Sequence, residues 1–146
     1  MKFKSLEQAH VGPQATTRVE FPEIAPHVTQ HEDGTETVVV PWLECRPAGE
    51  ANRAYTAAVL RQPDKTPLLK GRLTPEQIAA ERSSSLPLYA EHILTGNGGG
   101  WVDGETDQLV AMPLSVESRL ALLKQLPPDL FDRIRIRCND LANFRS

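Results

Sequence analysis

Prolines divide this chain into short segments and so limit the length of its helices and strands. The sequence has 12 prolines among 146 residues, and they cluster at the boundaries between apolar segments. Proline lacks a backbone N–H and fixes φ, so it is disfavoured inside helices and in central strands. We therefore predict many short elements with frequent stops.

The clearest β pattern in the chain is a hairpin. Asp33-Gly34 is a typical hairpin turn sequence, and the following residues 35–45 are rich in β-branched side chains. We expect residues 27–30 to be the partner strand.

Two prolines restrict where the strands can lie in a sheet. Residues 17–24 form a short strand candidate that Pro22 interrupts, so we expect this strand at an edge or ending early. Pro41 lies within the strand predicted for residues 35–45 and argues against a central position for it.

Helix patterns dominate the chain after residue 48. Thr74-Pro75-Glu76-Gln77 combines a capping box with a proline in the first turn, and Ser115 is a second N-cap candidate. Pro87 either kinks a helix or starts a new one, and Gly98-Gly99-Gly100 is expected to be a flexible joint. Residues 101–104 and 108–112 form a small hairpin candidate. The expected helices span residues 49–62, 74–85, 86–94, 115–126 and 129–141.

These elements predict an α+β fold, in which an N-terminal β-hairpin and short strands precede a mainly helical bundle of four to five helices. Residues 1–18 contain turn formers and few apolar side chains, so we expect an N-terminal arm. Residues 19–146 are expected to form a single α+β domain that is β-rich over 19–46 and helical over 48–146. The apolar content of 40% and charged content of 24% are those of a folded protein.

Charge and hydropathy argue against two classes of partner. The net charge of −3 gives no overall attraction to nucleic acid or to anionic lipid. No window approaches the ~18 consecutive apolar residues of a membrane span, and the first ten residues lack the apolar stretch of a signal peptide. We therefore predict no specific nucleic-acid partner and no membrane association.

No residue pattern in the sequence matches a known catalytic, cofactor-binding or metal-binding arrangement. Cys45 and Cys138 are far apart in the sequence and are expected to be free thiols. His27 and His31 are expected to be solvated loop residues. Residues 96–100 match neither glycine-rich phosphate-binding pattern. The carboxylates of residues 103–107 lack the closing glutamate of a calcium loop. We predict no catalytic residue, no cofactor and no metal.

Three sets of side chains are candidates for binding a protein partner. Four residues share one predicted helix face at helical spacing, namely Ala51, Ala54, Tyr55 and Ala58. Leu120 and Leu123 share another helix face, and Trp101 is a large amphipathic residue of the kind that anchors interfaces. The alternative is that these faces and Trp101 form the core of the chain itself.

Several segments, taken in order, resemble a family of small bacteriophage proteins, the tail assembly chaperones. The resemblance covers roughly residues 40–144 and rests on ANRAYTAAVL, on LYAEHILTG followed by GWVD, on PLSVESRLALLKQLPPDLFDRI and on NDLANF. The chain departs from this pattern at residues 97–99, which lengthen the joint before the Gly-Trp pair. Residues 1–40 have no counterpart in it.

The resemblance implies a non-enzymatic role in the assembly of phage tails. Such a chaperone binds the tape-measure protein and/or tail tube subunits in the host cytoplasm, and it uses no cofactor. The alternative is a virion structural protein, either a head–tail connector or a minor tail subunit, held among neighbouring virion subunits by its N-terminal arm. An enzyme or regulator of unknown type is a third hypothesis, and a homo-oligomer remains open.

Overall fold

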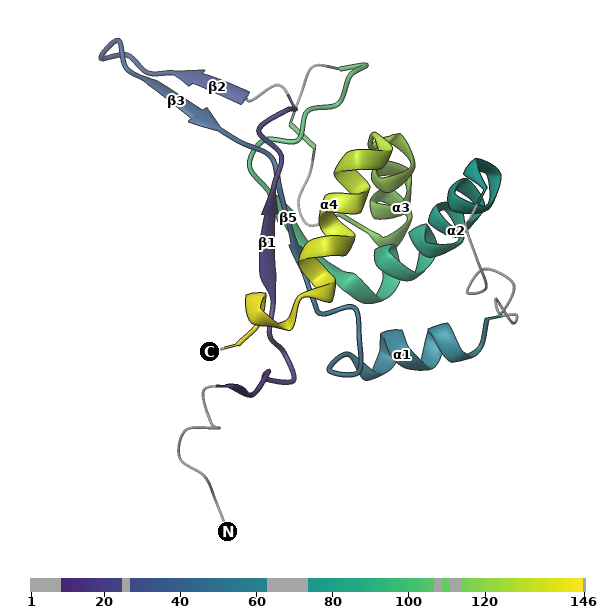
Figure 1. Cartoon of the computed structure of the whole chain (residues 1–146). Coiled ribbons are helices and arrows are strands. Elements are labelled where there is room, and N and C mark those ends of the chain that lie inside the picture. Colours follow the sequence, from purple (N-terminus) through teal and green to yellow (C-terminus); the bar gives the residue numbers. More distant parts are fainter. Residues whose placement is uncertain (1–8, 25–26, 63–73, 107–108, 111–113, 146) are drawn as a thin grey trace.

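The computed structural model describes residues 9–24, 27–62, 74–106, 109–110 and 114–145, and these residues form an α+β fold (Figure 1). The strands are β1 (Thr17–Glu20), β2 (His27–Gln30), β3 (Glu36–Val39), β4 (Trp42–Cys45) and β5 (Leu94–Gly98). The α-helices are α1 (Arg53–Leu60), α2 (Pro75–Leu88), α3 (Val116–Gln125) and α4 (Pro128–Asn139). A π-helical turn, η3 (Tyr89–Ile93), and a 3-10 turn, η4 (Leu141–Asn143), complete the described elements.

An antiparallel sheet of order β1-β4-β5 forms one side of the core. Val19 on β1 and Leu43 and Cys45 on β4 are buried, whereas their neighbours in the strands are more exposed. This alternation directs one face of the sheet toward the helices. Helix α4 lies against that sheet (Figure 1) and contributes the core residues Leu130, Phe131, Ile134 and Cys138, all of which are buried.

The predicted hairpin is confirmed. Strands β2 and β3 pair antiparallel with Val28 opposite Val38. In the turn, Gly34 has φ of 86°, and the Asp33 carboxylate accepts a hydrogen bond of 3.0 Å from the Thr35 N–H. The hairpin projects away from the helices (Figure 1).

Pro41 predicted that its strand would not be central in the sheet, and this prediction is wrong. Pro22 predicted an edge strand, and this prediction is confirmed. The single strand expected over residues 35–45 is two strands, and Pro41 stands between them, directly before β4. Proline at that place removes no ladder hydrogen bond from β4, so β4 can be central. The Pro41 carbonyl accepts a hydrogen bond of 2.9 Å from the Phe21 N–H, and β1 ends before Pro22 as an edge strand.

Side-chain caps fix the starts of three helices. The capping box of Thr74 and Gln77 is present, and Ser115 accepts a hydrogen bond of 3.2 Å from the Ser118 N–H, as predicted. Helix α1 starts later than expected because Asn52 is its N-cap. Helix α4 ends at Asn139, two residues before the end of the span predicted for it, and Leu141 is 41% exposed.

The helix predicted for residues 86–94 is only partly correct. Helix α2 continues through Pro87, and η3 then widens the helix so that the Leu94 N–H donates to the Tyr89 carbonyl five residues earlier. Leu94 begins β5, so the helical segment predicted for residues 48–146 is interrupted by a strand. The apolar residues of the helix predicted for residues 86–94 do face the core, since Tyr89 and Ile93 are buried.

The joint predicted for residues 98–100 begins with Gly98, which is the last residue of β5, and two of its glycines allow close packing. A Cβ added at Gly98 would lie 2.3 Å from Cζ2 of Trp42. Gly99 has φ of 77°, and a Cβ there would lie 1.9 Å from the Val40 carbonyl oxygen. Both positions therefore require glycine.

The described core connects the helices to the sheet through aromatic and sulfur contacts. The Tyr89 ring lies 5.3 Å from that of Phe131 and 5.9 Å from that of Tyr55, in edge-on arrangements. Cys45 and Cys138 are both buried free thiols, as predicted from their spacing. The hydrogen bond that the Cys45 thiol donates to Cys138, together with burial, holds the pKa of Cys45 well above its ordinary value of 9.0.

We expect Gly99→Ala to destabilise the fold by about 1–3 kcal/mol, because the new methyl group must displace backbone in a left-handed conformation. Gly49→Ala is the matched control, since a Cβ there meets nothing within 4 Å. Denaturant unfolding of both variants measures the difference. Equal stabilities would show that the chain relaxes around residue 99.

We expect Phe131→Ala to cost about 3–5 kcal/mol in the free energy of unfolding. The ring is 1% exposed, whereas Ile136 on the same helix is 73% exposed. Ile136→Ala is therefore the control and should change stability by less than about 0.5 kcal/mol. A loss under about 1 kcal/mol for Phe131→Ala would contradict its role in the core.

Candidate functional site

A groove of about 500 Å³ lies between the segment after β5 and helix α3. One wall comes from residues 101–105 and 110, and its lining side chains include Trp101, Val102, Asp103, Glu105 and Val110. The other wall comes from α3 and the residues before it, with Leu114, Ser118, Ala121, Leu122 and Gln125.

Trp101 is the fixed floor of this groove. Its indole Nε1–H donates a hydrogen bond of 3.0 Å to the Trp42 carbonyl, and its ring lies 5.7 Å from that of Phe21. The side chain is 7% exposed. Because the only polar atom of the indole is already bonded, the groove meets an apolar surface here.

The rest of this wall is tied to Trp101 by backbone contacts. The Val110 N–H donates 2.8 Å to the Trp101 carbonyl, and Val102 forms an isolated antiparallel bridge with Leu109. This bridge corresponds to the hairpin predicted for residues 101–104 and 108–112. Residues 108, 111 and 112 lie outside the described part of the chain.

Helix α3 is held in place by two side chains. The Leu114 N–H donates 3.1 Å to the Asn97 amide oxygen, just before the helix begins. The Arg119 guanidinium donates 2.9 Å to the Leu94 carbonyl, which ties the helix to β5. Both walls of the groove are therefore attached to the sheet, so the groove is formed before any partner binds.

The groove combines an apolar floor with an acidic rim. Asp103 and Glu105 are exposed, and the Asp103 carboxylate accepts a hydrogen bond of 2.8 Å from the Glu105 N–H, which fixes the turn between them. No group of three or more His, Cys, Asp or Glu side chains that could hold a metal occurs among the described residues. The arrangement suits binding of apolar side chains that have positive charge nearby.

The candidates on α3 and at Trp101 lie in different surroundings. Trp101 lines the groove, whereas Leu123 is 1% exposed in the core and Leu120 packs against that core. The groove-facing residues of α3 are instead Ser118, Ala121 and Leu122. The sequence pattern predicted none of these three, and Ser118 and Ala121 were missed because a small or polar residue at helical spacing resembles a solvated face.

The four candidates near α1 do not form one open surface. Ala58 is buried, Tyr55 is half-buried against Tyr89, Ala54 is exposed, and Ala51 precedes the helix. None of the four lines the groove. Partner binding by this face stays a prediction, and only part of it is accessible.

Asn52, which lies among these candidates, has a structural role that the sequence analysis missed. It is 0% exposed, accepts from the Tyr55 N–H, and donates 2.8 Å to the His92 carbonyl. The side chain thus caps α1 and ties it to η3. An Asn-x-x-Tyr pattern at a helix start is the sequence feature that indicates such a cap.

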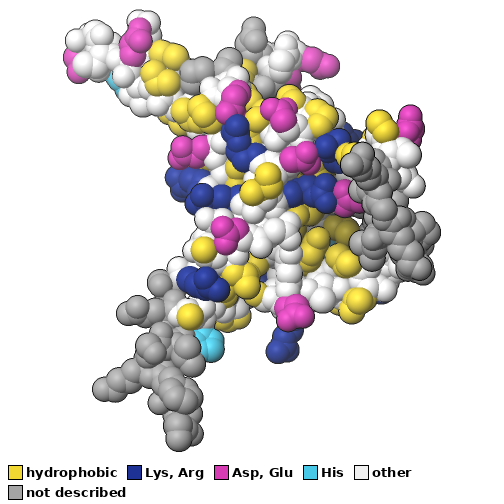
Figure 2. Space-filling view, in the orientation of Figure 1, with side chains coloured by type: hydrophobic (Ala, Val, Ile, Leu, Met, Phe, Trp, Pro, Cys, Tyr) yellow, Lys and Arg dark blue, Asp and Glu magenta, His cyan; other side chains and the backbone are white. Residues whose placement is uncertain are grey.

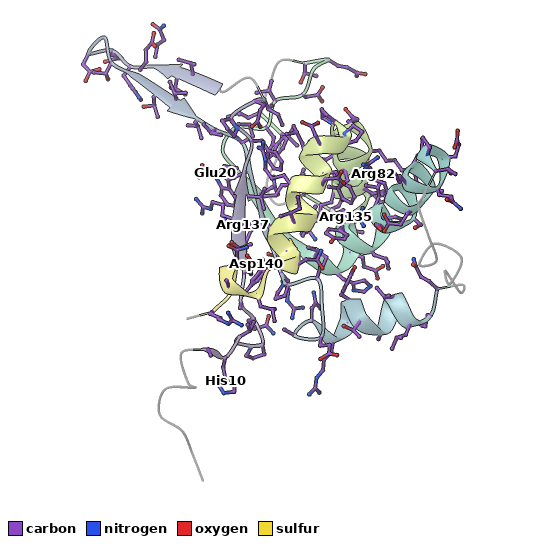
Figure 3. All side chains as sticks on the ribbon, in the orientation of Figure 1. His10, Glu20, Arg82, Arg135, Arg137 and Asp140 are labelled. Atoms are coloured by element: carbon purple, nitrogen blue, oxygen red, sulfur yellow. The ribbon has the colours of Figure 1, made fainter. Side chains whose placement is uncertain are left out.

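Three arginines of α4 hold the helix to its neighbours. Arg133 donates to both carboxylate oxygens of Glu23 at 2.6 and 2.7 Å. Arg135 pairs with Glu81 on α2 at 2.6 Å, and Arg137 donates to Thr17 of β1 at 3.1 Å. Figure 3 labels both arginines on α4. In Figure 2, positive and negative side chains are interleaved on this face. This arrangement does not resemble a basic surface for nucleic acid.

Searches against protein-family models, curated proteins and solved structures found no match to this chain. Within the described residues, every helix is too short or too polar to cross a bilayer.

The Glu23–Arg133 pair predicts a pH-dependent contribution to stability. The hydrogen bond from Arg133 lowers the pKa of Glu23 below its ordinary value of 4.5. Because the folded state favours the ionised carboxylate, Glu23 stabilises the fold above pH 4.5. This stabilisation is lost as the pH falls through the folded-state pKa of Glu23. We expect Glu23→Gln to be less stable than wild type at neutral pH and equal to it in acid.

Urea unfolding at several pH values measures this difference. Glu50→Gln, which changes an exposed carboxylate before α1, is the control and should give a small difference that does not vary with pH. A constant difference between wild type and Glu23→Gln across the acidic range would contradict the pairing.

Proposed function

We propose that this chain is a non-enzymatic bacteriophage tail assembly chaperone, which acts in the host cytoplasm and uses no cofactor. It binds the tape-measure protein and/or tail tube subunits while the tail forms. One observation supports this more than any other. The groove lies between GWVD and PLSVESRLALLKQL, which are two of the segments on which the resemblance to such chaperones rests.

The groove has the physical properties that this role requires. A chaperone of this kind must hold an amphipathic chain reversibly at many similar places, so each contact should be weak and many copies should act together. The groove is small and lined by aliphatic and small side chains, and its walls are fixed before binding. Little ordering entropy is therefore lost when a segment enters.

A virion structural protein is the second candidate, and the β2–β3 hairpin favours it. Val28 and Val38 lie opposite each other and are 43% and 57% exposed. A two-stranded hairpin is marginally stable in water, and open strand edges pair readily with other chains. A projecting hairpin of this kind suits a subunit that contacts its neighbours in a particle.

The chaperone proposal predicts that the protein is present in lysates of infected cells and missing from purified mature particles. Quantitative mass spectrometry of both fractions tests this, with the tail tube protein as the control that must occur in both. A fixed, stoichiometric amount in the particle would contradict the chaperone proposal and support the virion subunit.

A further inference from the structure

We infer that the groove beside α3 binds an amphipathic helix whose apolar face is flanked by lysine or arginine. The inference rests on the proposed function only for the source of that helix, which would be another tail protein. The shape, the backbone hydrogen bonds and the charge of the groove each support it.

The shape of the groove suits a helix. Leu114, Ser118, Ala121, Leu122 and Gln125 each lie three or four residues from another member of the set, so they form one face of α3 and its start. Ser118 and Ala121 are small and exposed. A second helix can therefore approach α3 to the ~8–10 Å separation of packed helices.

The backbone of the groove favours a helix over an extended peptide. The Val110 N–H is bonded to the Trp101 carbonyl, and the Leu114 N–H is bonded to Asn97. An extended peptide needs free backbone groups for strand addition, and these two N–H groups are already paired. A helix satisfies its own backbone and needs only side-chain contacts.

The volume of the groove suits a few large side chains. The groove holds about 500 Å³, and Trp101, Val102 and Leu122 are among the apolar residues that line it. A leucine or aromatic side chain that enters this space would be shielded from water, and such central anchors contribute most of the affinity of protein interfaces.

The charge of the rim selects the sign of the partner. Asp103 and Glu105 lie on the groove wall, and the hydrogen bond between them fixes the turn that carries both carboxylates. Lysine or arginine beside the apolar face of the helix would pair with them, whereas glutamate would be repelled. The net charge of −3 over the whole chain acts in the same direction.

Two synthetic helices with the same apolar face test the inference on the full chain. Each has about 20 residues, which is long enough to form a helix. One carries lysine on its polar face and the other glutamate. Binding is followed by two-dimensional NMR, in which the Trp101 indole N–H and the amides of α3 report on the groove. We expect the lysine peptide to shift these signals and to bind at least about tenfold more tightly than the glutamate peptide.

Two variants and their controls locate the binding. Ala121→Trp fills the groove, and Ala80→Trp makes the same change at an exposed alanine on α2. Asp103→Asn combined with Glu105→Gln removes the acidic rim, and Glu50→Gln combined with Glu91→Gln removes two exposed carboxylates elsewhere. We expect each groove variant to weaken lysine-peptide binding by at least about tenfold and each control to leave it unchanged.

The outcomes separate this inference from the proposed function. Equal affinity for the two peptides, or NMR shifts confined to other elements, would overturn the inference even if the protein purifies with tail proteins. Groove signals that depend on protein concentration without peptide would also overturn it, because they would assign the groove to a second copy of the chain. Groove-specific binding of the lysine peptide, with the protein found in mature particles, would instead overturn the chaperone proposal alone.

Discussion

The close approach of β5 to the Trp42 ring is the contact on which most of the described fold depends. Gly98 lies opposite Trp42 in the sheet, and there is no room between them for a side chain. This approach brings the chain after β5 beside β4, where the Trp101 indole reaches the Trp42 carbonyl. The central position of β4 and the floor of the groove therefore have the same cause. Gly98, the last residue of β5, and Gly99, which follows it, both lack a Cβ.

Side chains that bond to backbone groups arrange the helices around the junction of η3 and β5. Asn52 bonds to the His92 carbonyl, and Arg119 bonds to the Leu94 carbonyl two residues later. Helices α1 and α3 are thereby attached to neighbouring residues of one segment. A polar group that bonds a buried carbonyl satisfies it at a defined position, which hydrophobic contact alone does not do.

The local features of this fold could be predicted from the sequence, and the features that depend on distant residues could not. The hairpin turn and the caps at Thr74 and Ser115 were predicted because their residues lie within a few positions of each other. Strand β5 was missed because its glycines resemble a loop until Trp42, far away in the sequence, is placed against them. Trp101 was predicted as a candidate and lines the groove. The backbone carbonyl that its indole contacts and the residues of α3 that face it were not predicted.

The direct passage from η3 into β5 fixes the length of the chain at this point. Ile93 is the last residue of the π-helical turn and Leu94 the first of the strand, with no loop residue between them. One inserted or deleted residue would turn each side chain of β5 to the opposite face of the sheet. It would also move Gly98 away from Trp42. Variation in length among proteins with this fold should therefore be confined to other connections, because no turn is available here to absorb it.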